Sequence, residues 1–193
     1  MIDAGYFVKR IEPKPEYLQA SAVREICSVS NCISAGPDDW ISFWLHNDLG
    51  WFNRIADALR VIPSGHEAEY RLFAYRVYPE VFTGEGRVSL KLAEDVEPEP
   101  IGADFTSLGF DSASRFMPSI LGLECSPLSC NAMAAEISAN EYCLFATLEE
   151  ALASAERFAA EQPEPGDYWV IEVLESKAAR HRLNLEPGEP VNL

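Results

Sequence analysis

The stretch EYCLFATLEEALASAERFAAEQPEPGDYWVIEVL, residues 141–174, has the clearest structural pattern in this chain of 193 residues. Thr147 and Glu150 match a capping box, in which two side chains cap backbone nitrogens at the start of a helix. Apolar residues then recur at helical spacing to about Glu161. They are Leu148, Ala151, Leu152, Ala155, Phe158 and Ala159. The stretch predicts a strand over 141–145, a helix over 147–161 and, after two prolines, a strand over 167–174.

Further elements are predicted towards the N-terminus. Residues 5–11 alternate like a strand and are followed by two prolines. Asp38 can cap a helix that carries two tryptophans, and Asn53 can cap a second, shorter helix. Residues 69–78 have apolar and aromatic side chains on both faces, which indicates a strand inside a sheet.

These elements predict an α+β fold: a mixed sheet with short helices and a C-terminal β-α-β-like segment. The length suits one domain over residues 1–193. Residues 84–104 have the weakest pattern, so we interpret them as a surface loop or a division between two lobes. We identify no internal repeat in the sequence.

The charge of the chain is strongly negative and uneven. The formal net charge is −16. Residues 1–96 hold 10 Lys and Arg against 14 Asp and Glu, and residues 97–193 hold 5 against 17. This balance argues against nucleic-acid binding and suits a basic protein partner. We see no apolar run of membrane-spanning length and no secretion signal, so we expect a cytoplasmic protein with reduced cysteines.

Four of the five cysteines form two pairs with the same spacing, Cys27 with Cys32 and Cys125 with Cys130. Four thiolates can hold a structural zinc ion, but neither pair contains a turn glycine, and packing explains buried thiols equally well. We therefore predict no metal and no cofactor.

A thiolate enzyme is an alternative. If Asn131 caps a short helix over 132–137, Cys130 precedes a helix N-terminus, whose dipole favours a thiolate. Cys125 shares the loop at 124–131. His46 is the best candidate base, with Asn47 beside it.

Two other groups of residues are candidates for a binding or catalytic role. Trp44 and Trp51 flank a turn and can line a pocket or anchor a partner. Arg115, in a serine-rich strand, can bind a dinucleotide for ADP-ribose transfer, with Glu172 as the acid. This second pattern is short and recurs by chance.

The leading hypothesis is a protein-binding module of the immunity or antitoxin kind, which associates with a basic partner. Its acidic C-terminal half supplies the contacts, and the candidates are Glu149, Glu156 and Glu164. Glu149 and Glu156 lie on the polar side of the capped helix. Oppositely charged surfaces accelerate association in a salt-dependent way.

Overall fold

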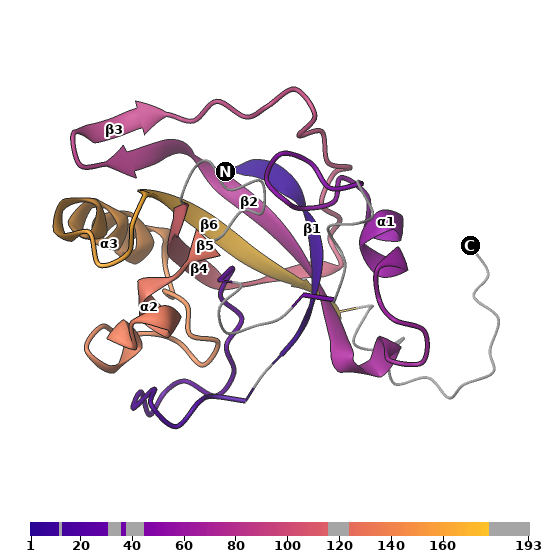
Figure 1. Ribbon diagram of the computed structural model, residues 1–193, viewed down its shortest axis with the longest axis horizontal. Helices are drawn as coiled ribbons and strands as arrows, with labels where there is room; N and C mark the ends of the chain where they lie inside the picture. Colours follow the sequence, from indigo (N-terminus) through magenta and orange to yellow (C-terminus); the bar gives the residue numbers. More distant parts are fainter. Residues whose placement is uncertain (12, 31–35, 38–44, 116–123, 178–193) are drawn as a thin grey trace.

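Strands make up most of the regular structure in the computed structural model (Figure 1), which describes residues 1–11, 13–30, 36–37, 45–115 and 124–177. Its strands are β1 (Ile2–Arg10), β2 (Tyr70–Thr83), β3 (Gly86–Ser89), β4 (Phe105–Arg115), β5 (Glu124–Cys125) and β6 (Asp167–Ser176). Its helices are α1 (Ile55–Arg60), α2 (Pro127–Cys130) and α3 (Leu148–Glu161), with two 3₁₀ turns, η2 (Glu67–Glu69) and η3 (Met133–Ala135).

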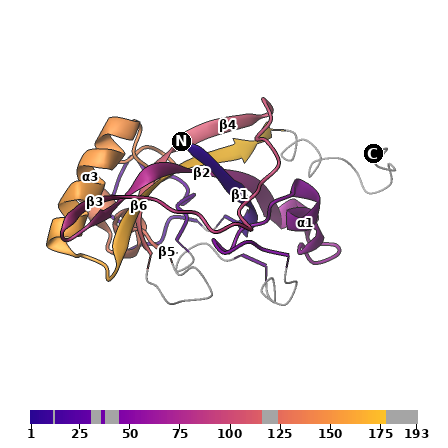
Figure 2. The same ribbon diagram turned by 90° about the horizontal axis from the view of Figure 1, so that it is seen from above.

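All six strands belong to one sheet. Its order is β1-β2-β6-β4-β5, and β3 pairs with the end of β2. Every strand pairing among the described residues is antiparallel. The mixed sheet predicted from the sequence is therefore wrong for this part of the chain, because β4 and β6, on either side of α3, pair in opposite directions. Figure 2 shows α3 and α1 at opposite ends of the molecule.

The two faces of the sheet are distinguished by α3. Alternate side chains of β4 and β6 point towards the helix: the Ser112 hydroxyl donates to the Ala151 carbonyl on α3 at 2.7 Å, and Tyr168 packs against Phe158. We call this the α3 face. On the opposite face lie Asp111, Ala113, Arg115, Trp169 and Ile171, which pair across the two strands.

The structure contains the elements for which the local sequence signals are strongest. The capping box forms: the Glu150 N–H donates to the Thr147 hydroxyl at 3.3 Å, and the Thr147 N–H donates to the Glu150 carboxylate at 3.1 Å. Ala155 and Phe158 are fully buried on α3, whereas Leu152 is half-buried. The predicted strands over 5–11, 69–78 and 167–174 correspond to β1, β2 and β6.

Other predicted elements differ from the structure. Residues 141–145 form a loop with a single bridge, between Phe145 and Phe110, rather than a strand. Of the helix predicted over 132–137, only the 3₁₀ turn η3 forms, and the preceding loop contains α2. Arg54, not Asn53, is the N-cap of α1. The helix predicted after Asp38 lies outside the described residues. Residues 84–104 include β3, and four apolar residues of this segment pack against the core.

Two loops in different halves of the chain share one hydrogen-bond pattern. In each, an asparagine side-chain oxygen accepts from the N–H groups two and four residues on, and its side-chain nitrogen donates to the carbonyl that precedes a strand glycine. The residues are Asn47, Leu49, Trp51 and Ala4 in the first half, and Asn140, Tyr142, Leu144 and Leu108 in the second. Each loop ends in a phenylalanine that pairs with the residue after that glycine, as Phe52 with Tyr6 and Phe145 with Phe110.

The glycines of these two sites lie at equivalent points of the sheet. Gly5 and Gly109 each follow an irregularity in the strand register and have φ values of 146° and 138°. A Cβ on Gly109 would lie 2.5 Å from a backbone oxygen, and one on Gly5 would lie 2.8 Å from the Trp51 side chain. Gly5 pairs with Tyr75, Tyr75 with Val173, and Val173 with Gly109. The order strand, asparagine loop, helix, strand thus occurs twice. An approximate twofold axis between Tyr75 and Val173 relates the two copies. The sequence pattern indicated no repeat, and at the level of structure that inference is wrong.

Candidate functional site

The cysteine loop does not have the geometry expected of an activated thiolate. Cys130 is the last residue of α2, which begins at Pro127. It therefore lies at the C-terminal end of a helix, where the dipole disfavours negative charge, so the predicted position ahead of a helix is wrong. Its Sγ lies 2.9 Å from the Ser30 hydroxyl. Cys125 lies in β5, paired with Ser114.

Cys27 and Cys143 are buried thiols. Burial raises the pKa of both to about 12, so they remain protonated at neutral pH. Among the described residues, no three His, Cys, Asp or Glu side chains are grouped closely enough to hold a metal ion. Cys32 lies outside the described residues.

His46 and Asn47 lie in the first asparagine loop. Asn47 is buried, and both atoms of its side-chain amide are used: the oxygen accepts two backbone N–H groups, and the nitrogen donates to the Ala4 carbonyl and to Asn53, each at 2.9 Å. It therefore holds the loop against β1 and is not available to orient a base. His46 pairs with Phe52 in the same loop, whereas α2, which carries Cys130, packs against β4.

Trp51 is part of the core. Its ring lies 4.6 Å from that of Tyr75, centroid to centroid, and only 5% of the residue is exposed. It is therefore not the exposed contact residue that the turn predicted. Trp44 lies outside the described residues.

The strand register does not bring Arg115 and Glu172 together. Arg115 projects from the face opposite α3, where its guanidinium lies 5.0 Å from the Trp169 ring centroid and donates to the Asp48 carbonyl at 2.7 Å. Glu172 pairs with Phe110 in the register and so projects from the α3 face, where it contacts Arg76 at 3.4 Å. The serines beside Arg115 also point away from it, since Ser112 bonds to α3.

The face opposite α3 carries charged groups that are buried or half-buried. Arg71 pairs with Glu175 on β6 and with Glu25 at 2.7 Å. The Lys9 ammonium donates to backbone carbonyls of the 28–30 segment, at 2.9 and 3.0 Å for the two shortest contacts. Asp111 is fully buried. A charged residue among apolar neighbours in a predicted strand is the sequence signal for such a group. In the structure, Lys9 and Asp111 bond to the 28–30 segment, which covers the sheet.

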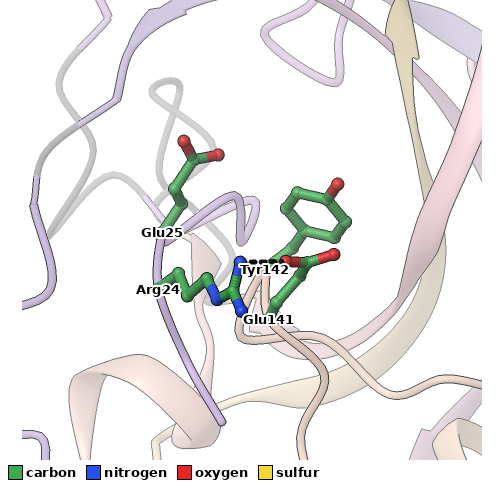
Figure 3. Close-up of a pocket in the computed structure, with 4 residues that line it drawn as sticks. All are labelled: Arg24, Glu25, Glu141 and Tyr142. Carbon is green, nitrogen blue, oxygen red and sulfur yellow. Dashed lines mark ion pairs between the residues drawn. The ribbon is translucent and has the colours of Figure 1, made fainter.

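A shallow pocket of about 190 Å³ includes Glu25, the ion-pair partner of Arg71 (Figure 3). It is lined by Arg24, Glu25, Glu141 and Tyr142. Arg24 faces Glu141 at 3.6 Å, and Glu25 faces Arg71 at 2.7 Å. Each carboxylate of the pocket therefore lies within ion-pair distance of an arginine.

Of the three candidate acidic residues, Glu149 and Glu156 lie on α3, and Glu164 lies three residues beyond its end. Glu149 and Glu156 are exposed, and Glu156 pairs with Arg87 on β3 at 3.3 Å. Glu164, beyond the helix end, is half-buried and accepts from Asn131 at 2.7 Å. Burial raises the pKa of Glu164 above its usual range.

The β2–β3 hairpin lies beside α3 and continues this surface (Figure 1). All four residues of β3 are exposed. Glu80, at the base of the hairpin, and Glu85, in its turn, add two further carboxylates. Glu80, Glu85, Glu149 and Glu156 together define what we call the α3–hairpin surface, on which Arg87 pairs with Glu80 and Glu156.

Comparisons with family models, with curated proteins and with solved structures found no match for this chain. Within the described residues, no helix combines the length and the apolar character needed to cross a membrane.

Proposed function

We propose that the protein acts by binding a basic protein partner through the α3–hairpin surface, in the manner of an immunity or antitoxin protein. One observation carries the proposal: α3 buries its apolar side, with Ala151, Ala155 and Phe158, against the sheet and presents glutamates outward. The core therefore needs nothing further from this helix, and its outer side is free to meet a partner.

The charge of the chain supports the same function. With a net charge of −16, the protein attracts basic surfaces over about a Debye length, roughly 8–10 Å at physiological salt. Concentrating exposed glutamates on a rigid helix directs that attraction to one place. Charge complementarity of this kind acts chiefly on the association rate.

The test compares two double variants with the same change in net charge. Proteins retained by the immobilised chain from an extract of its own host are identified, and a retained protein is purified and titrated. Glu149→Lys with Glu156→Lys should slow association about tenfold at low salt and much less at high salt. Glu94→Lys with Glu97→Lys, at exposed positions next to Asn53 and α1, is the matched control.

The two variants separate a specific surface from general charge. If both slow association equally, only the net charge matters and the α3–hairpin surface has no special role. If neither has an effect and the retained protein is not basic, the proposed function is wrong. Circular dichroism and thermal unfolding of each variant verify that the fold is intact.

A further inference from the structure

Among the described residues, no strand pairs with the outer edge of β3. Its four residues pair with β2 on one side in the order Glu80 with Ser89, Val81 with Val88, Phe82 with Arg87 and Thr83 with Gly86. In Figure 1, β3 is the outermost strand at the end of the molecule that carries α3. β1, which continues the same edge of the sheet along β2, is instead covered by the loop ending in Phe52.

The register shows which backbone groups of β3 point outward. Leu90, just after β3, donates its N–H to the Pro79 carbonyl at 2.9 Å. Hydrogen-bonded and non-bonded pairs alternate along an antiparallel ladder, so Val88, like Leu90, directs its N–H and C=O towards β2. Arg87 and Ser89 therefore direct theirs away from the sheet, which leaves an N–H and a C=O of each residue for another strand.

The side chain that normally protects such an edge is folded back. A charged residue on an edge strand discourages pairing with other chains. The Arg87 guanidinium, however, lies 4.9 Å from the Phe82 ring centroid and contacts Glu156 at 3.3 Å and Glu80 at 3.9 Å. It lies over its own sheet and is compensated there, so the edge of the backbone stays accessible.

We infer that the basic partner adds an extended segment to β3 as a further antiparallel strand. This inference rests on the proposed function, because it states how the partner binds. Strand addition obtains affinity from main-chain hydrogen bonds and specificity from alternate side chains.

The rows of side chains across the hairpin specify the chemistry of that segment. Ser89 is opposite Glu80 in the register. A lysine or arginine of the added strand that lies beside Ser89 is therefore on the same face as the Glu80 carboxylate, which favours a positive charge there. Val88, 51% exposed, continues the row of Val81 and Trp169 on the other face. The added segment therefore alternates an apolar residue beside Val88 with a basic residue beside Ser89. A second copy of this chain is a poor occupant because each copy carries a charge of −16.

The experiment uses a defined probe, a fluorescein-labelled peptide with the sequence lysine-threonine-valine-lysine-valine-threonine-lysine, and measures its anisotropy with the full chain. Ser89→Pro removes one outward N–H and places a ring on the edge, while the hydrogen bonds to β2 remain. It should weaken binding about tenfold or more. Ser89→Ala, the matched control, should bind as the wild type does.

A second measurement avoids any change to the protein. Amide methylation at the threonines and the central lysine, which point their N–H groups at β3 in this register, should abolish binding. Methylation at the two valines should not. This comparison decides the question if Ser89→Pro fails to fold.

Each outcome has a distinct meaning. Binding that is lost with Ser89→Pro, or with peptide methylation on the facing edge, supports strand addition. Absent binding to the wild type, or equal binding by Ser89→Pro and the wild type, overturns it. A wild-type dimer that Ser89→Pro converts to monomers, with no peptide binding, assigns the edge to a second copy and also overturns it. The proposed function is judged separately, by the Glu149 and Glu156 reversals with the purified partner.

Discussion

Asn47 and Asn140 make equivalent hydrogen bonds in two loops that lie in different halves of the chain. Each side-chain oxygen accepts two backbone N–H groups of its own loop, and each side-chain nitrogen donates to a strand carbonyl, at 2.9 Å for Asn47 and 2.7 Å for Asn140. The loops are thereby fastened to β1 and β4, the two strands that carry Gly5 and Gly109.

Replacing either asparagine by alanine should destabilise the fold by a similar amount. Both substitutions leave two loop N–H groups and one strand carbonyl without their partner, and we expect each to lower the free energy of unfolding by about 2–4 kcal/mol. Urea-induced unfolding measures this. Asn131→Ala, which removes an exposed side chain with two hydrogen bonds, is the control and should cost less than about 1 kcal/mol. A loss below about 0.5 kcal/mol at either loop would show that the shared pattern is not stabilising.

The repeated loops also show why only part of this fold could be predicted from sequence patterns. The helix over 147–161 was predicted because its capping box and its apolar spacing are local. The repeat is not evident in the sequence, because the identical residues at its matching places are few and scattered; they include the glycine, the asparagine and the phenylalanine, and Ala58 with Ala151 and Leu59 with Leu152 in the helices. Even the residue with positive φ in each loop differs: it is Gly50 in one and Cys143 in the other.

The candidate site was still less predictable, because it depends on which strands become neighbours. The alternation of β4 gives its two faces, but only the pairing of β4 with β6 shows that Arg115 and Glu172 lie on opposite ones. Likewise, a tryptophan next to a turn can be exposed or buried. Trp51 is buried because it packs against Tyr75 on β2. Such long-range pairings leave no local pattern in a single sequence.

The contribution of Asp111 to the free energy of unfolding should decrease as the pH rises. Burial raises its pKa above the ordinary value, against the opposing effect of hydrogen bonds from Ser126 and Val29. Above about pH 4 the unfolded chain has lost this proton, while the folded chain still holds it. The folded state then binds more protons, so the free energy of unfolding falls with increasing pH until the folded-state pKa is passed.

The variant Asp111→Asn isolates this contribution. The stability of the wild type minus that of the variant, measured by urea unfolding from pH 3.5 to 7, should decrease as the pH rises. Subtraction removes the contributions of other carboxylates, which both proteins share. An increase instead would mean that the hydrogen bonds and the Lys9 charge outweigh burial and lower the pKa of Asp111.

The cysteines should differ in their reaction with iodoacetamide. Cys27 and Cys143 are buried, with pKa raised to about 12, so we expect both to resist labelling in the native protein at pH 7 and to react after unfolding. Cys125 and Cys130 are half-buried and should react first among these four. Mass spectrometry of tryptic peptides gives the rate at each site. Labelling of Cys130 far faster than an ordinary thiol, with loss of an activity, would favour the thiolate enzyme over the binding function.

Arg71 should contribute far more to stability than Arg24, although each pairs with a glutamate. The Arg71 side chain is 14% exposed and that of its partner Glu175 is 6% exposed, against 79% and 48% for Arg24 and Glu141. Arg71→Met leaves the Glu175 carboxylate buried without its arginine and should cost about 3–5 kcal/mol. Arg24→Met breaks a solvated pair and should cost about 0–1 kcal/mol. Adding Glu175→Leu to Arg71→Met should recover much of the loss, because it removes the uncompensated charge. Urea unfolding of the four proteins measures these differences, and equal costs at the two arginines would show that water reaches the Arg71 pair.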